Sequence, residues 1–333
     1  MRIDPAHGRA PSRAAVTLAI SLLMTVWAVN FLVVKIGIRY LPVVAFASFR
    51  IVAAGLFMIL IAPFCARLSI FREPQVSPCS GRTLNRPCSS APFAAQGRTW
   101  RDYWTFAYIG FFGVSLNQFF FSLALRYTNV THSSIIVGIG PINTLILAIL
   151  FRLERATIRK ALGMLVALAG VVILATGSGV SRHSPTLLGD VLTLIGSLAF
   201  AMYVVLGKRV AGNYNPLTMT TWNFVFGGLL LLPVAIHSAM ALGPLSNWRT
   251  IPWQAWACIF YTGLFSSTLA YLFYFWLLGF LEASQLAAFS YLLPVSASAL
   301  GILLLGERGS WSELLGGTLA LLGLYWIEST RSR

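Results

Sequence analysis

Two pairs of polar side chains inside apolar segments are the first candidates for a ligand site in this sequence. Asn117 and Gln118 are neighbours in one apolar segment, and Tyr271 and Tyr274 lie three residues apart in another, on one face of a helix. A buried amide without a partner costs on the order of several kcal/mol, so these amides need a partner or a wet cavity. Amides facing tyrosines would suit a zwitterion with an apolar side chain. The competing interpretation is hydrogen bonding between helices.

A tryptophan and an asparagine near the N-terminus form a second candidate group. Trp27 and Asn30 are three residues apart and share a helix face with Phe31. Because Trp27 lies far from both ends of its apolar segment, it is outside the aromatic belt that membrane helices place at the headgroups. We therefore favour a cavity wall over plain packing for both residues. Tyr203 and Tyr291 are further candidates, although aromatic residues at helical spacing more often pack than bind.

Two prolines and one arginine also stand inside apolar segments. Pro141 and Pro294 each remove a backbone hydrogen bond and are expected to bend their helices, either as hinges or as fixed kinks. Their matched positions in a sequence repeat favour hinges. Arg50 lies about two turns into its segment, where a charge at the centre of a membrane would cost about 2.5 to 3.5 kcal/mol. We expect a structural role for Arg50, with its side chain reaching the membrane surface.

The sequence contains no group of residues typical of an enzyme or of a metal centre. Its four cysteines and four histidines are scattered, without metal-ligand spacing or paired acids. A nucleotide-binding loop of the form G-x-x-x-x-G-K-[ST] is absent. We therefore predict no catalytic residue, no metal site and no cofactor. A multi-spanning membrane enzyme, such as a lipid or prenyl transferase, stays a distant alternative.

The composition is that of an integral membrane protein. Of the 333 residues, 57% are hydrophobic and 10% are charged, whereas soluble domains have about 25% charged residues. The net charge of +15 would suggest a nucleic-acid partner in a soluble protein, but the basic residues lie in short loops between apolar segments. Orientation in a bilayer explains them better. We expect the lipid bilayer, and no nucleic acid, as a partner.

Ten segments come near the roughly 20 apolar residues that a membrane-spanning helix needs. They cover residues 14–38, 43–65, 103–125, 131–151, 159–176, 188–207, 216–237, 253–277, 283–305 and 312–328. Of the 24 Lys and Arg residues, 17 fall on the side of the N-terminus, five on the opposite side and two within helices. This excess predicts that both termini are cytoplasmic. The polar segment of about residues 67–101 is predicted to be disordered.

A sequence repeat divides the chain into two halves. An offset of 153 residues maps Asn117 and Gln118 onto Ala270 and Tyr271. The same offset relates Pro141 to Pro294, Glu154 to Glu307, Gly163 to Gly316 and Gly170 to Gly323. Because each half has five spans, the second half enters the membrane from the opposite side. We predict an all-α integral membrane protein of ten transmembrane helices in two inverted five-helix repeats, residues 1–176 and 177–333. Such duplication is typical of secondary transporters, which bind substrate between the halves.

Two stretches of the chain resemble a known family. They read ALRYTNVTHSSIIVGIGPINTLILAILFRLERATIRKALGMLVALAGVVIL and VWAVNFLVVKIGIRYLPVVAFASFR. Both are similar to parts of the EamA family within the drug/metabolite transporter superfamily, and the resemblance covers nearly the whole chain as two EamA units. It implies export of small metabolites, often amino acids, by alternating access, with helices one, three, four, six, eight and nine around a central cavity. Gln118 departs from the family, in which an aromatic residue is expected.

These observations predict a secondary transporter in a bacterial-type inner membrane. We expect it to export small metabolites, most simply amino acids with aromatic or apolar side chains. The acids near the spans all lie close to predicted helix ends, so direct proton coupling is not evident; they are Asp190, Glu282, Glu313 and Glu328. We therefore expect a facilitator or exchanger that acts as a monomer. The alternative is a multidrug or organic-cation exporter of the same superfamily, which would need an acid in its cavity.

Overall fold

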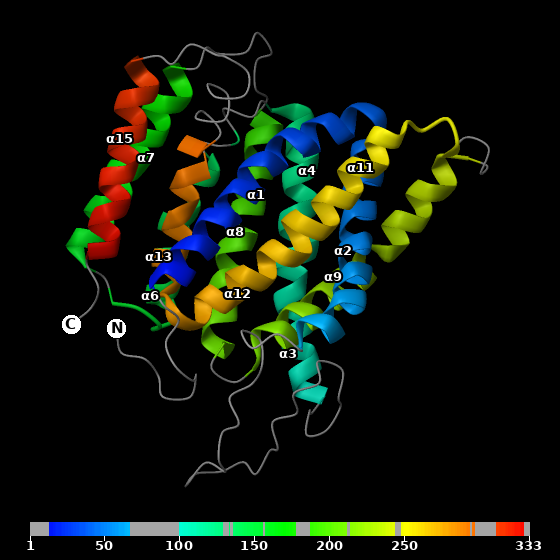
Figure 1. The fold of residues 1–333 in the computed structure, drawn as a ribbon, viewed down its shortest axis with the longest axis horizontal. Coiled ribbons are helices and arrows are strands. Elements are labelled where there is room, and N and C mark those ends of the chain that lie inside the picture. The colour runs from blue at the N-terminus through cyan, green and yellow to red at the C-terminus, as the bar shows by residue number, and fades with distance from the viewer. Residues whose placement is uncertain are drawn as a thin grey trace, which may run out of the picture.

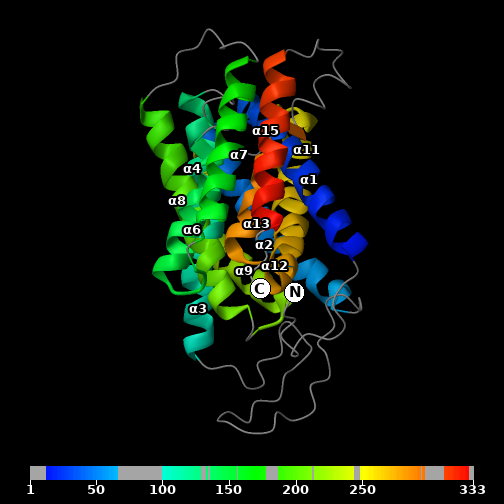
Figure 2. The same cartoon turned by 90° about the vertical axis from the view of Figure 1, so that its left-hand side faces the viewer.

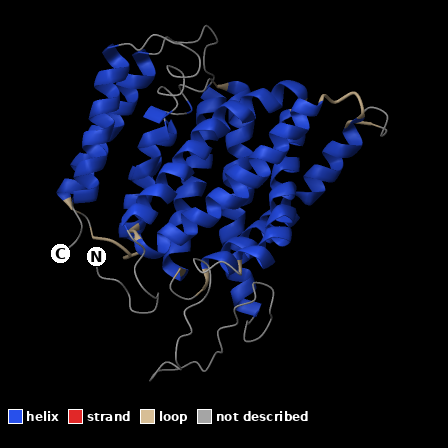
Figure 3. Ribbon diagram, viewed as in Figure 1, coloured by secondary structure: helices blue, strands red, loops and turns tan. Residues whose placement is uncertain are grey.

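Every element described in the computed structural model is a helix (Figure 3). The structure describes residues 13–66, 100–128, 133, 136–155, 157–177, 187–211, 214–243, 248–293, 295–296 and 311–329. Within these residues, six helices are long and apolar enough to cross a membrane. The prediction of an all-α membrane protein is therefore confirmed at this level.

The helices of the first half begin and end close to the predicted limits. They are α1 (Arg13–Tyr40), α2 (Val43–Cys65), α3 (Trp100–Gly110), η1 (Phe111–Leu116), α4 (Asn117–Tyr127), α6 (Gly140–Leu150) and α7 (Ile158–Gly177). The predicted disordered segment lies outside the described residues, except that Trp100 and Arg101 already belong to α3. The predicted span 131–151 is described in part, and its regular helix begins at Gly140.

The second half follows the same pattern. Its elements are α8 (Leu187–Val210), α9 (Pro216–Ala241), α11 (Trp253–Tyr261), η2 (Thr262–Leu269), α12 (Ala270–Phe280), α13 (Ala283–Ala288), η3 (Phe289–Tyr291) and α15 (Trp311–Ser329). The later part of the predicted span 283–305, together with Pro294, lies outside the described residues. The predicted hinge at Pro294 therefore stays a prediction.

Two long helices contain a π-helical middle. The π-helix η1 joins α3 to α4, and η2 joins α11 to α12, which makes two continuous rods, Trp100–Tyr127 and Trp253–Phe280. Adding the offset of 153 residues to the bounds of the first rod gives the bounds of the second. π-turns are rare and frequently occur at functional sites. The sequence repeat thus has a counterpart in an unusual local structure.

Helices α7 and α15 pack side by side at one edge of the molecule (Figures 1 and 2). Glycines allow this contact, because a Cβ atom added to Gly323 would lie 2.5 Å from the carbonyl oxygen of Gly163. A Cβ atom added to Gly170 would lie 2.6 Å from the carbonyl oxygen of Gly316. Backbone therefore touches backbone, as small residues permit between membrane helices.

The remaining helices surround the centre of the molecule (Figure 1). Helix α8 packs against α4, α6 and α12, while α13 packs against α6 and α1 against α12. Helix α2 lies against α9, α4 and η2. This arrangement places η1 next to α8 and η2 next to α1, around the space described below.

Candidate functional site

A cavity of about 110 Å³ lies between these helices. Its walls come from the parts of the chain predicted as spans one, three, four, six, eight and nine, with one residue added from α2. The lining residues are Trp27, Asn30, Phe31, Arg50, Asn117, Gln118, Phe121, Val137, Gly140, Pro141, Thr144, Thr193, Gly196, Ser197, Phe200, Ser266, Tyr271, Ala287, Ser290 and Leu293.

Asn117 connects three helices at the cavity wall. Its Nδ2 donates a hydrogen bond to the carbonyl oxygen of Gly196 on α8 at 2.9 Å. Its Oδ1 accepts one from the hydroxyl of Tyr271 on α12 at 3.2 Å. The expected meeting of an amide with a tyrosine is therefore present for this pair. Asn117 therefore hydrogen-bonds neighbouring helices and lines the cavity, and its role in binding a ligand stays a prediction.

The α1 residues Trp27 and Asn30 face the same cavity. The indole Nε1 of Trp27 donates to the carbonyl oxygen of Ser266 at 3.1 Å, which fixes the ring against η2. The Oδ1 atom of Asn30 is buried and has no hydrogen-bond partner among the described residues. A buried acceptor of this kind is normally satisfied. Asn30 thus offers the cavity an unused acceptor.

Gln118 meets an arginine and a serine. Its Oε1 accepts hydrogen bonds from Nη2 of Arg50 at 3.0 Å and from the Ser267 hydroxyl at 2.8 Å. Arg50 is only 3% exposed, and its Nη1 lies 3.5 Å from the hydroxyl of Ser122. The expectation that Arg50 reaches the membrane surface is wrong, because the packing of α2 against α4 and η2 turns it inward. An ionisable residue inside a membrane helix is the sequence signal that pointed to this role.

Three predicted site residues, all tyrosines, are absent from the cavity lining. Tyr203 and Tyr274 belong to a cluster of rings with Trp27, Phe200 and Tyr271, which we call the aromatic cluster. The ring centroids of Trp27 and Tyr274 are 5.5 Å apart, and those of Tyr203 and Tyr271 are 5.6 Å apart. Tyr291 is buried elsewhere, in a smaller core with residues of α7 and α15. A binding role for these three tyrosines stays a prediction.

The aromatic cluster covers one end of the cavity. On α8, Tyr203 lies beyond Phe200 in the direction of Lys208, and on α12, Tyr274 lies beyond Tyr271 in the direction of Leu281. Both directions lead to the same end of the molecule, because the ammonium of Lys208 donates to the carbonyl oxygen of Leu281 at 2.8 Å. We call this the Lys208 end. The rings of Trp27, Phe200 and Tyr271 belong both to the cavity wall and to the aromatic cluster.

The first proline of the predicted hinge pair also lines the cavity. Pro141 occupies the first turn of α6, where its missing N–H is tolerated. The helical residues 136–138 and α6 are separated by a turn at Ile139, whose amide donates to the carbonyl oxygen of Ile136 at 3.1 Å. The helix is thus interrupted just before Pro141. Whether this interruption moves during function stays a prediction.

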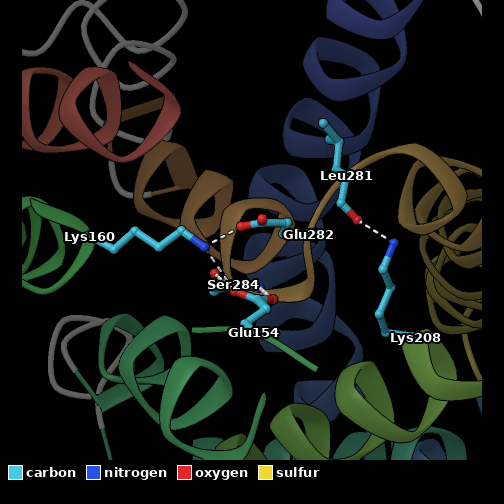
Figure 4. A network of polar contacts seen from close by, with 6 residues as sticks. All are labelled: Glu154, Lys160, Lys208, Leu281, Glu282 and Ser284. Atoms are coloured by element: carbon cyan, nitrogen blue, oxygen red, sulfur yellow. Dashed lines mark hydrogen bonds and ion pairs between the residues drawn. The ribbon is translucent and has the colours of Figure 1, made fainter. Parts of the chain in front are cut away.

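A group of charged residues joins two loops at the Lys208 end (Figure 4). The ammonium of Lys160, in the first turn of α7, contacts Glu154 at 3.1 Å and also contacts Glu282. Glu154 accepts hydrogen bonds from the backbone N–H of Ser284 at 3.0 Å and from its hydroxyl. The side chains of Lys160 and Glu154 are each 4% exposed. We call Glu154, Lys160, Glu282 and Ser284 the charged clamp.

The end of α6 positions the clamp. Arg152 adopts a left-handed backbone conformation with φ 58°. The next amide, that of Leu153, donates to the carbonyl oxygen of Ala148 at 2.8 Å. This is a C-cap of the Schellman type, which ends a helix and reverses the chain. Glu154 follows directly and is thereby turned toward Ser284 at the start of α13.

The described residues contain no group of three potential metal ligands. None of the described residues that line the cavity is acidic. Among the described acids, Glu154 and Glu282 belong to the charged clamp, and Asp190 accepts a hydrogen bond from Thr128 at 3.1 Å. The cavity therefore combines one guanidinium, uncharged polar groups and aromatic rings.

Fold and cavity define a class, that of helical membrane proteins with a cavity between their helices that is lined by aromatic rings and polar groups. Sequence comparison places the chain within that class. The chain belongs to the EamA-like transporter family, whose profile matches residues 14–176 and again residues 187–329. It is therefore a membrane transporter.

Individual relatives agree with this family. An uncharacterized transporter of Archaeoglobus fulgidus is 27% identical over 94% of this chain and 99% of its own length. The uncharacterized transporter YyaM of Bacillus subtilis is 30% identical, covering 65% of this chain and 69% of its own length. A solved crystal structure with 18% identity has a TM-score of 0.63 and covers 95% of this chain and 96% of its own. That likeness concerns the fold.

Proposed function

We propose that this transporter exports small metabolites, most simply amino acids with apolar or aromatic side chains. The observation that carries the proposal is the composition of the cavity wall, in which amides and hydroxyls alternate with the rings of Trp27, Phe31, Phe121 and Phe200. Ligand pockets of this kind bind the apolar part of a small molecule on rings and orient it with a few polar groups. The free Oδ1 of Asn30 is a suitable acceptor for an ammonium group.

The cavity gives no support to the alternative of an organic-cation exporter. Such a carrier needs an acid to compensate the charge of its substrate, and none of the lining residues is acidic. Arg50 instead places a positive charge at the wall. Since like charges repel strongly where water is scarce, a cation would be disfavoured here. Transport, rather than catalysis, is the function that we propose.

We infer that the chain works by alternating access between two inverted halves, residues 1–176 and 177–333, with ten transmembrane helices. Three observations support this mechanism. The two rods with π-helical middles have matching bounds, the glycines at the α7–α15 contact are related by the same offset, and the cavity is lined by residues from both halves. Inverted repeats with a site between them are typical of secondary transporters.

We further propose a monomeric protein of a bacterial-type inner membrane with both termini cytoplasmic. The Lys208 end is then the cytoplasmic end, because Lys208 and Lys160 are among the basic residues at helix ends that the distribution of charge places inside. No lining acid is available to carry a proton, so the substrate gradient would drive a facilitator or exchanger. The lipid bilayer and the substrate are the expected partners.

Purified protein in liposomes tests this function. Vesicles preloaded with one unlabelled amino acid receive the same labelled amino acid outside, and accumulation is followed for leucine, phenylalanine and tryptophan with and without a pH gradient. We expect accumulation that is faster than in vesicles without the protein and that does not depend on the pH gradient. If no labelled amino acid enters faster than in empty vesicles, amino-acid export is wrong.

A further inference from the structure

Arg50 is a buried cation without a carboxylate partner among the described residues. Its guanidinium donates to Gln118 at 3.0 Å and lies 3.5 Å from Ser122, and both of these groups are uncharged. The two ion pairs of the described residues both involve Lys160 instead. Buried charges are normally paired, because the loss of water is costly. The charge of Arg50 is therefore available to a ligand.

Part of the hydrogen-bonding capacity of Arg50 is also unused. The Nε atom is buried and has no partner among the described residues. A guanidinium presents its N–H groups as a planar fork that fits the two oxygens of a carboxylate, and such paired hydrogen bonds are stronger than neutral ones. Because Arg50 belongs to the lining of the cavity, an oxyanion inside the cavity can reach it.

The neighbours of Arg50 hold it in place. The Oε1 atom of Gln118 accepts from Arg50 and, at 2.8 Å, from the hydroxyl of Ser267 in η2. Ser122 donates in turn to the carbonyl oxygen of Gln118 at 2.8 Å. The guanidinium is thus fixed between α4 and η2 before a ligand arrives. A preorganised group loses less freedom on binding, which favours affinity.

We propose that Arg50 is the carboxylate-binding group of the cavity, so that the substrates of this transporter carry a free carboxylate. This inference rests on the proposed function in one respect, that the cavity holds the transported molecule. Asn30 accepts a hydrogen bond from the ammonium of an amino acid, while the rings of Trp27 and Phe200 contact its side chain. Carboxylates without an ammonium group bind through Arg50 alone.

The competing explanation is that Arg50 only ties α2 to α4 and η2. Both explanations predict damage when Arg50 is removed, so the test has to ask for selectivity between ligands. The purified wild-type protein is compared with Arg50→Gln and Arg50→Lys. A matched control is Arg126→Gln, because Arg126 is exposed at the end of α4 and does not line the cavity.

The ligands are chosen to differ in one group at a time. They are leucine, leucinamide, which lacks the carboxylate, and N-acetylleucine, which lacks the ammonium. Binding is measured as the shift of the melting temperature in detergent, and transport as competition with labelled leucine in liposomes. The wild-type protein and Arg126→Gln should prefer leucine over leucinamide by about tenfold or more, as expected for a hydrogen bond to a charged group.

Arg50→Gln should lose this preference, so that leucine and leucinamide bind about equally. Arg50→Lys keeps the charge without the planar fork and should restore part of the preference. If Arg50→Gln is unfolded, the preference of the wild-type protein and the partial recovery in Arg50→Lys still decide the matter. The proposal is overturned if folded Arg50→Gln retains the preference. It is equally overturned if the wild-type protein shows none, or if no carboxylate shifts its melting temperature.

The outcomes separate this inference from the proposed function. If N-acetylleucine binds and is transported while leucine is not, Arg50 is a carboxylate site and amino-acid export is wrong. If leucine and leucinamide are transported equally well, the exporter stands and the role of Arg50 is wrong. The absence of both transport and carboxylate binding rejects both.

Discussion

At the scale of single residues, the polar side chains that line the cavity also form hydrogen bonds with neighbouring helices. Asn117 binds α8 and α12, and Gln118 binds Arg50 and Ser267, yet both amides remain part of the cavity wall. Hydrogen bonds of this kind hold the two side chains in a fixed geometry. Gln118 replaces the aromatic residue that the family resemblance implies, and its oxygen is what holds the guanidinium. Substrate choice should therefore depend on this unmatched position.

Replacing Tyr271 by Phe tests whether the cavity depends on a single hydroxyl. The change keeps the ring but removes the 3.2 Å hydrogen bond to Asn117, so the amide is oriented only by its bond to Gly196. We expect an increase of a few-fold in the KM for leucine, in line with about 1 kcal/mol for one neutral hydrogen bond. Initial rates of uptake into liposomes at several leucine concentrations provide the measurement.

Tyr274→Phe is the matched control for this prediction. Its hydroxyl is buried without a partner among the described residues and lies outside the cavity wall. We expect unchanged transport and an equal or higher melting temperature, because removing an unsatisfied buried hydroxyl is not costly. A loss of transport in Tyr274→Phe as large as that in Tyr271→Phe would show that the aromatic cluster, rather than the cavity wall, contacts the substrate.

At the scale of elements, glycine decides which helices can touch. We expect Gly323→Ala to lower the melting temperature by several degrees, because its Cβ would lie 2.4 Å from the backbone nitrogen of Ala167. Overpacking of this kind costs about 1 to 3 kcal/mol. In Gly279→Ala the new Cβ meets nothing within 4 Å, so this variant should be neutral or slightly more stable. Equal melting temperatures for the two variants in detergent would contradict the close contact of α7 and α15.

The limits of these elements follow from the sequence more readily than their orientation does. Apolar runs and the 153-residue offset predicted α2 at 43–65 and two related rods near 103–125 and 253–277. The inward position of Arg50 could not be predicted in this way. Rotation of α2 about its own axis depends on its contacts with α9, α4 and η2, which one sequence does not reveal. The π-helical segments η1 and η2 could not be predicted either, because no residue composition is specific to a π-helix.

At the scale of the whole molecule, two groups of contacts lie at the Lys208 end, the aromatic cluster and the charged clamp. The aromatic cluster fills the space between α1, α8 and α12, and the charged clamp connects the loop after α6 with the start of α13. If the two halves move against each other during transport, the clamp has to break whenever this end opens. Its strength therefore sets part of the balance between the closed and open states.

Glu154→Gln should shift that balance toward opening at the Lys208 end. The amide keeps the size of the side chain but loses the ion pair with Lys160. Removing one partner of a buried pair is costly, because the charge of the other partner stays buried. With the native cysteines replaced, Ser197→Cys places a thiol in the cavity wall. We expect a membrane-impermeant maleimide to label it a few-fold faster from the cytoplasmic side in Glu154→Gln than in the parent. Asp102→Asn is the matched control, because Asp102 accepts a hydrogen bond from Tyr214 at 2.6 Å and takes no part in the clamp. Equal labelling rates in both variants would mean that the clamp joins the loops without restraining the opening of this end.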